Sequence, residues 1–480
     1  MRISLDLSIK MNGVKTPNIV FIIFDTMRKD AITPYGANAR TYAFSYLAEK
    51  GVYLDNVVST SNWTIPSHAS FFTGMYPHEH KVHEGNVLDK KSYSSILKRD
   101  PFNLPEIMKR KGYFNVGISS NPIVSRLTGF ANGFDEFHET YTINLMELKE
   151  KVVSIIGRDK YVGRYETFIK LLREGRIKDI LKLMEMQHEF NKKFSELMRK
   201  GYPLDKGGST VLAKINEIKL SKPFFLFINL MEMHEPYLIP DDIRFGRRNL
   251  IKQYDNQTLT SEIKRILENK IPSASYVQKL NVSYRRASTY SDELLSSVIK
   301  MIREKGVYDD TIFIATSDHG QSLYENNFFS HAIFLHDEII HLPLIMSNVN
   351  LIKNSQANNR YEYIQNMDIY SLIKTISDGE KEAAIGREFA LSESYSYLGD
   401  ARNFMEAFPS QTEQIDYLNS PRKALFLEGF KIVVNSMDSK IDEFSRNGKK
   451  LDPKDHKQQV DKMLDKINEM KGQDAFYVNQ

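Results

Sequence analysis

Two stretches of the sequence place polar side chains shortly after runs of strongly apolar residues. Asp25 follows Asn18–Phe24 (NIVFIIF), and the adjacent pair Asp318-His319 follows Thr311–Thr316 (TIFIAT). A carboxylate after a parallel strand can bind a ligand or cap a helix, so Asp25 alone leaves both interpretations open. An adjacent Asp-His pair after such an apolar strand is better explained by a chemical role than by a structural one. Oxygen and imidazole donors suit zinc or manganese, whereas calcium and magnesium prefer all-oxygen sites. The pair therefore predicts a site for one cation.

A further candidate is Thr64, in the stretch Asn62–Ser70 (NWTIPSHAS). Pro66 fits the first turn of a helix that begins near Thr64, and the N–H groups and dipole at such a helix end favour an anion. The alternative is that Thr64 only caps the helix. Asn62-Trp63-Thr64 is also a glycosylation sequon, but no secretory signal supports its use.

Histidines follow the ends of the same apolar runs. His234 lies in Met231–Tyr237 (MEMHEPY), just after a third run, and His331 and His336 follow the Asp-His pair. A single histidine is usually structural. Three of the 12 histidines in such positions favour a shared site without establishing it.

The elements that would position these residues alternate along the chain. Helical patterns at 103–111 and 290–305 lie between runs of β-branched and aromatic residues. The runs that we interpret as buried strands are Asn18–Phe24, Phe114–Ser119, Pro223–Leu230 and Thr311–Thr316. This alternation predicts an α/β/α sandwich with a large, mostly parallel central sheet.

The pattern changes after about residue 377. Lys423–Leu427 and Phe430–Asn435 have the pattern of a hairpin, and a charged helix is expected over Lys457–Lys471. We therefore expect a main domain over residues 1–377 and a smaller α+β subdomain with a short antiparallel sheet over residues 378–480.

Two segments look inserted into the main domain, near residues 141–220 and 242–285. The first has helical periodicity, and residues 141–200 contain 14 basic and 9 acidic residues, a net charge of +5. Such a segment could cover a site or bind an anionic partner, but a solvated amphipathic hairpin is the interpretation that we favour.

The composition excludes several classes of protein. The 480-residue chain has 65 basic and 61 acidic residues, so its net charge is only +4, and binding to a nucleic-acid duplex is not expected. The absence of cysteine excludes disulfides and thiolate chemistry. No apolar run approaches the ~20 residues of a membrane-spanning helix, and residues 1–15 lack the pattern of a signal peptide. A cytoplasmic location is therefore favoured.

Several spaced motifs together resemble the alkaline phosphatase superfamily, in its sulfatase and phosphonate monoester hydrolase branch. They span about residues 17 to 377 in the family's order. The matching stretches are 18–28, 63–74, 77–82, 133–135, 223–237, 284–320 and 366–376, and Lys431 in FKIVVN resembles the family's C-terminal hairpin.

The resemblance implies a role for each candidate residue. Asp25, Asp318 and His319 match metal ligands, and Thr64 stands at the nucleophile position, where it should also touch the metal. His234 matches the histidine that contacts the transferred anionic group. His331 falls near a further basic or metal-binding position, and a second metal would be held if His331 and His336 both turned inward.

The sequence also departs from the pattern of sulfatases. Their Cys/Ser-x-Pro-x-Arg motif, whose first residue is oxidised to formylglycine, is replaced here by Thr64 and His68. Threonine cannot yield that aldehyde, and Thr26 replaces the second of the usual paired aspartates. The set Asp, Thr, Asp, His resembles the superfamily's one-metal phosphotransferases and phosphodiesterases that use threonine.

These observations predict a metal-dependent phosphatase or phosphodiesterase that forms a phosphothreonine at Thr64. His234 would stabilise the phosphoryl oxygens, and His68 would bond the nucleophile or the phosphate. Zinc or manganese is favoured as the cation, with calcium as an alternative. The substrate would be a small-molecule or glycan anionic ester. The alternatives are a sulfuric ester hydrolase, a phosphotransferase to a glycan or lipid, and a non-catalytic protein that binds a metal or polyanion.

Overall fold

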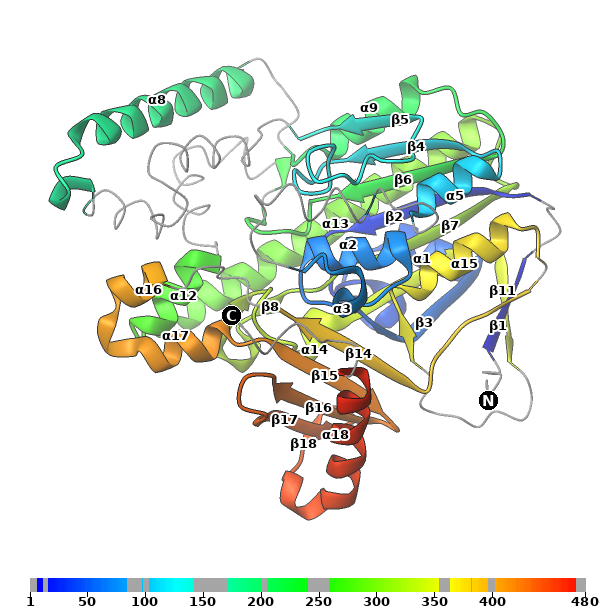
Figure 1. Cartoon of the computed structure of the whole chain (residues 1–480). Coiled ribbons are helices and arrows are strands. Elements are labelled where there is room, and N and C mark those ends of the chain that lie inside the picture. The colour runs from blue at the N-terminus through cyan, green and yellow to red at the C-terminus, as the bar shows by residue number, and fades with distance from the viewer. Residues whose placement is uncertain are drawn as a thin grey trace.

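An eight-stranded sheet forms the centre of the computed structural model (Figure 1). The structure describes residues 7–11, 16–83, 97, 103–141, 169, 171–199, 205–237, 239–240, 259–353, 363–380, 382–395 and 402–471. In spatial order the strands are β12 (Ile364–Gln365), β3 (Gly51–Val58), β10 (His341–Ser347), β7 (Thr311–Thr316), β2 (Asn18–Phe24), β6 (Phe224–Leu230), β4 (Phe114–Ser119) and β5 (Glu136–Glu139). Only β10 runs antiparallel to its neighbours in this sheet. The predicted mostly parallel sheet is therefore confirmed.

Helices cover both faces of the sheet because its strands are apolar on both sides. Val20 and Ile22 of β2 point into one core, and Ile19 and Phe21 point into the other. The first core is closed by α1 (Tyr42–Glu49), α9 (Gly208–Glu217) and α13 (Ala274–Glu304). The second is closed by α2 (Thr64–Thr73), α5 (Leu104–Arg110) and α15 (Asp368–Ser377). The molecule is thus an α/β/α sandwich, as the sequence predicts.

The two predicted insertions are described only in part. Residues 142–168 and 241–258, on which much of them falls, lie outside the described residues. In the first, α8 (Ile177–Arg199) extends away from the sheet at the upper left of Figure 1. In the second, α12 (Leu259–Leu267) is followed by α13, whose Leu280 and Tyr284 are buried in the first core. Residues 274–285 therefore belong to the sandwich itself and do not form a separate insertion.

The C-terminal part contains the predicted short antiparallel sheet. Its strands are β14 (Phe389–Ser394), β15 (Arg422–Leu427), β16 (Phe430–Asn435), β17 (Ile441–Arg446) and β18 (Lys449–Lys450). Helix α18 (Lys457–Lys471) packs on it through Val460, Met463 and Ile467. Two shorter helices, α16 (Arg402–Ala407) and α17 (Thr412–Asn419), precede the hairpin of β15 and β16.

Smaller elements complete the described chain. A three-stranded sheet joins β11 (Val349–Lys353), β1 (Leu7–Met11) and β13 (Glu382–Ala384), and β8 (Ser322–Leu323) pairs with β9 (Phe329–Ser330). The short helices α3 (Pro77–His80) and α14 (Asp337–Ile340) follow α2 and β9. Among the described helices, none has both the length and the apolar character needed to span a bilayer.

A buried ion cluster joins the C-terminal sheet to the short helix α3. Glu393 of β14 accepts hydrogen bonds from the backbone N–H and Nδ1 of His78 in α3, both at 3.0 Å. Its other oxygen lies 3.1 Å from the Lys423 ammonium of β15. Burial raises the pKa of Glu393, but His78 and Lys423 outweigh burial and hold that pKa at about 2. Because Glu393 also bridges to Ser61, the cluster braces the segment that leads into α2.

Replacing Glu393 with glutamine should destabilise the protein by about 3 kcal/mol, because it removes one charge of a buried pair. Chemical denaturation followed by circular dichroism measures the loss. The matched control is Glu428→Gln, whose carboxylate pairs with Lys462 on the surface; it should change stability little. Equal effects of the two substitutions would contradict the role of this cluster.

Candidate active site

The register of the central sheet brings the candidate metal ligands together. Ile23 of β2 pairs with Thr316 of β7 and with Asn229 of β6. Asp25 and Asp318 each lie two residues beyond these paired positions. Since the carboxyl ends of parallel strands lie at one edge of a sheet, the two carboxylates meet there.

Asp25, Asp318 and His319 form a fully buried group whose donor atoms lie within 4.8 Å of one another. Asp25 Oδ2 accepts from Asn121 Nδ2 at 2.6 Å, and Asp318 Oδ1 accepts from the backbone N–H groups of Thr26 and His319. The other oxygens, Asp25 Oδ1 and Asp318 Oδ2, are buried without a hydrogen-bond partner among the described residues.

The tautomer of His319 completes this donor set. Its Nδ1 donates to the Gly320 carbonyl at 2.9 Å, which leaves the lone pair on Nε2. Nε2 lies 3.5 Å from Asp318 Oδ2 and 4.0 Å from Asp25 Oδ1. Two unsatisfied buried carboxylate oxygens and an imidazole lone pair fit a divalent cation, and a carbonyl on the far nitrogen is the usual support of a metal-binding histidine.

The two carboxyls have raised pKa values, so a cation that binds them would displace protons. Burial, with the neighbouring Asp318 charge, raises the pKa of Asp25 to about 7. Burial likewise raises the pKa of Asp318 to about 6, against the lowering effect of its backbone donors. Both groups therefore hold protons more tightly in the folded chain than in the unfolded one, where the pKa of an aspartate is about 3.9.

Cation binding should consequently strengthen as pH rises. A carboxyl whose pKa is raised by folding stabilises the folded state fully below about pH 4, and this contribution is lost as pH rises through its folded pKa. A cation binds only the deprotonated pair. We expect the increase in Tm on adding manganese or zinc to be clearly larger at pH 8 than at pH 5, as measured by differential scanning fluorimetry. An increase independent of pH would contradict this account.

Thr64 is the first residue of α2, and its side chain does not cap the helix. The N-cap is Trp63, which makes no side-chain capping bond. The Thr64 hydroxyl lies 3.4 Å from His319 Nε2, and Thr64 is 2% exposed. The hydroxyl therefore stands beside the candidate cation site, at a helix end that favours negative charge.

His68 lies one turn further along α2 and contacts Thr64 through the backbone. Its Nδ1 donates to the Thr64 carbonyl at 2.9 Å, and its Nε2 accepts from Asn229 Nδ2 at 3.0 Å. Burial lowers the pKa of His68 to about 3, so the ring is neutral and its single N–H is already used. Both ring nitrogens thus have hydrogen-bond partners, and Nδ1 also lies 3.5 Å from Asp318 Oδ2. We infer that His68 positions the start of α2.

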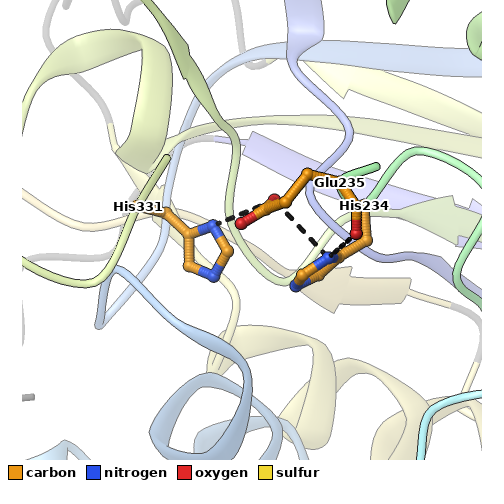
Figure 2. Close-up of side chains that lie close together, drawn as sticks. All are labelled: His234, Glu235 and His331. Atoms are coloured by element: carbon orange, nitrogen blue, oxygen red, sulfur yellow. Dashed lines mark hydrogen bonds and ion pairs between the residues drawn. The ribbon is translucent and has the colours of Figure 1, made fainter. Parts of the chain in front are cut away.

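A second group lies next to the first and comprises His234, Glu235 and His331 (Figure 2). His234 Nδ1 donates to the Glu235 carbonyl at 2.9 Å, and His331 Nδ1 donates to Gln321 Oε1 at 2.7 Å. Gln321 Nε2 donates to Glu235 Oε2 at 3.1 Å. Because a carboxylate only accepts, this bond fixes the orientation of the Gln321 amide and hence the proton on His331 Nδ1.

The second group borders the candidate cation site. The His331 ring lies 4.4 Å from the His319 ring and 5.2 Å from the His234 ring, measured between centroids. Burial lowers the pKa of His331 well below its usual value. Each of these imidazoles uses Nδ1 on a carbonyl or amide oxygen, so Nε2 is the nitrogen left for a ligand.

His336 does not join this group. Its ring stacks on Phe334 at 5.0 Å, and its Nδ1 lies 3.6 Å from Glu338 Oε1. Among the described residues it belongs to neither candidate metal group. Of the two histidines named for a possible second metal, His331 belongs to the second group and His336 does not.

Several residues of the site were not predicted from the sequence. They are Asn121, Lys206, Asn229, Glu235 and Gln321. Asn121 follows β4 and Asn229 lies near the end of β6, so the rule that found Asp25 could also have found them. Thr26, at the position of the second aspartate, has φ of 59° and donates its N–H to Asp318.

Known proteins are similar to this chain in sequence and in fold. The sequence matches the family described as Sulfatase over residues 17–376. It is 20% identical to the uncharacterised sulfatase YidJ of Escherichia coli K12 over 443 residues, which cover 89% of this chain and 80% of YidJ.

Solved structures share the fold over nearly the whole chain. The 2-O GAG sulfatase BT1596 superposes with a TM-score of 0.61 at 13% identity, covering 96% of this chain and 93% of that one. The phosphonate monoester hydrolase SpPMH of Silicibacter pomeroyi has a TM-score of 0.60 at 16% identity, with 96% of each chain covered. Identities this low show a common fold only.

Proposed function

This chain belongs to the sulfatase family, and on that basis we propose that it is a metal-dependent hydrolase that cleaves phosphate mono- or diesters through a covalent phosphothreonine at Thr64. The observation that carries the proposal is the Thr64 hydroxyl, which lies at a helix N-terminus 3.4 Å from His319 Nε2. Two buried carboxylate oxygens without partners among the described residues lie beside it. Proteins similar to this chain in sequence or fold are named as sulfatases and as phosphonate monoester hydrolases.

Asp25, Asp318 and His319 are the residues that would hold the cation, with Thr64 Oγ1 adjoining them. When bound, the cation supplies a positive charge that lowers the pKa of the Thr64 hydroxyl and offsets negative charge on the reacting group. Zinc or manganese suits this mixed set of oxygen and nitrogen donors, and calcium is the alternative.

The residues of the chain then provide the covalent steps. Thr64 Oγ1 gives its proton to water and attacks phosphorus in line with the ester oxygen. A P–Oγ1 bond forms as the bond to the leaving oxygen breaks, and the leaving oxygen takes up a proton from water. The N-terminal N–H groups of α2 face the charge that develops on the phosphoryl oxygens. Water then attacks phosphorus and breaks the P–Oγ1 bond, and one of its protons passes to Oγ1 to restore the Thr64 hydroxyl. The product is phosphate from a monoester, or a phosphate monoester from a diester.

Two histidines bind and orient the anionic group. His234 uses Nδ1 on the Glu235 carbonyl, so its Nε2 remains for an oxygen of the ester. His331 is held by Gln321 and Glu235 and closes the opposite side of the second group. His68 keeps the first turn of α2 in place through the Thr64 carbonyl.

Phosphorus is preferred over sulfur because of the nucleophile. Threonine cannot form the aldehyde hydrate that expels sulfate from a sulfatase by breaking a C–O bond, so a threonine sulfate would need water to attack sulfur. Sulfate ester hydrolysis remains the second candidate, because the similarity to proteins named as sulfatases extends over almost the entire chain. Another solved structure of this fold is BT4656 in complex with its substrate D-glucosamine-2-N,6-O-disulfate, which makes a glycan ester a reasonable substrate class for this chain.

One assay separates these functions. The purified protein is stripped of metal, reloaded with zinc, manganese or calcium, and given nitrophenyl phosphate, bis-nitrophenyl phosphate, a nitrophenyl phosphonate and nitrophenyl sulfate. We expect the phosphorus esters to turn over faster than the sulfate and only with metal. Faster turnover of the sulfate would show that a threonine nucleophile does not disfavour sulfur. Turnover of none of the four would favour a transferase or a non-catalytic protein.

A further inference from the structure

A lysine outside the family motifs lies beside the candidate active site. The Lys206 ammonium donates a hydrogen bond to the backbone carbonyl of His234, the residue proposed to contact the ester. Lys206 lies within the first predicted insertion, just before α9, whose Val211 and Ile215 are buried in the first core. Its charge also interacts with those of Glu235 and Asp25, which belong to the two candidate ligand groups.

The backbone around Lys206 is held firmly against the edge of the central sheet. Glu232, just after β6, accepts from the N–H of Lys206 at 3.3 Å and from the N–H of Gly208 at 3.0 Å. Gly207 has φ of 118°, and a Cβ added there would lie 2.9 Å from Ser120 Cβ. Only glycine fits so close an approach with positive φ. The base of the Lys206 side chain is therefore preorganised before any ligand binds.

The ammonium itself is incompletely satisfied. It has three N–H donors, and its one described hydrogen-bond partner is the neutral His234 carbonyl. In the part of the chain that the structure describes, no carboxylate lies within ion-pair distance of it. A partly buried cation without a close counter-ion is costly unless an anion pairs with it.

The other basic side chains near this edge of the sheet are already bonded to neighbouring residues. Arg28 is tied to Asp30 and Glu325 by contacts of 2.6 Å. His68 is neutral and has its N–H bonded to Thr64, although it stands where sulfatases carry an arginine. Lys206 thus keeps N–H donors beside His234, whereas the N–H groups of Arg28 and His68 are engaged by other residues.

We propose that the Lys206 ammonium binds a non-bridging oxygen of the substrate's phosphoryl or sulfuryl group, next to His234. This inference rests on the proposed function for the identity of that group. It makes Lys206 a binding residue supplied by the segment preceding α9, and it predicts that the chain recognises a tetrahedral oxyanion through this charge.

The test is the binding of inorganic phosphate and of sulfate to the metal-loaded full-length protein, measured by isothermal titration calorimetry. Loss of a charge-assisted hydrogen bond should raise the Kd of Lys206→Met by about 10- to 100-fold, and Lys206→Arg should retain most of the affinity. The matched control is Lys214→Met in α9, because Lys214 pairs with Glu217 at the surface; its Kd should be unchanged.

The outcomes separate this inference from the proposed function. Unchanged anion affinity in Lys206→Met, or no anion binding by the wild-type chain, would overturn the role of Lys206. An unaltered Tm in Lys206→Met, together with weaker anion binding, would exclude a purely structural role. If anion binding depends on Lys206 but no ester is cleaved, the proposed function fails and the inference stands.

Discussion

Turnover of the preferred ester should fall by about 10³-fold or more when Thr64 is replaced by valine. Valine keeps the branched shape of threonine but lacks the hydroxyl that lies 3.4 Å from His319 Nε2. The fold should tolerate the change, because Trp63 occupies the N-cap position and the Thr64 side chain caps nothing. Initial rates with saturating metal give kcat, and a metal-binding titration checks that the site is otherwise intact.

The matched control lies on the same helix. Thr73 is also buried near the end of α2, and its hydroxyl donates to the Ala69 carbonyl at 2.7 Å, away from the site. Thr73→Val should cost about 1 kcal/mol of stability and leave turnover within a few-fold of wild type. Thr64→Ser should keep part of the activity because it retains a hydroxyl. Full turnover by Thr64→Val would mean that water, and not Thr64, attacks the ester.

The second large effect is expected for Asp25→Asn, which should act in opposite directions on activity and on stability. Loss of a ligand should weaken metal binding by about 100-fold or more and reduce turnover accordingly. In the metal-free protein at pH 8, however, the substitution should raise the Tm. There the charged Asp25 is fully buried beside Asp318, and its pKa of about 7 shows that burial and Asp318 disfavour its charge.

The substituted asparagine should keep the existing contact, since its amide oxygen can accept from Asn121 as Asp25 Oδ2 does. The control is Asp292→Asn. Asp292 is a buried carboxylate of α13 that accepts from the N–H groups of Ala43 and Phe44 at the start of α1, both at 3.0 Å. Asp292→Asn should lower the Tm by a similar amount with or without metal. If metal-free Asp25→Asn had a lower Tm than metal-free wild type at pH 8, the role of Asp25 would be to stabilise the fold and not to bind a ligand.

The main elements could be predicted because buried parallel strands are apolar on both faces. β2, β4 and β7 have the bounds expected from their apolar runs, and β6 begins one residue later. The start of helix α13 was harder to predict, because only Leu280 and Tyr284 are buried among its residues 274–285. Such a segment has the composition of an insertion until its packing is known.

The sequence alone determined the chemistry at the ends of the strands. Asp25, Asp318 and His319 follow apolar runs, and parallel strands place their carboxyl ends at one edge, so these residue types predict a cation site. The nucleophile role of Thr64 comes from the family resemblance and is part of our proposal. Only the tertiary structure decided which residues His68, His336 and Lys206 contact. His68 meets Asn229 across 161 residues of sequence, and Lys206 reaches His234 across 28. These contacts depend on how separate segments pack against one edge of the sheet, and no local pattern of side chains encodes that packing.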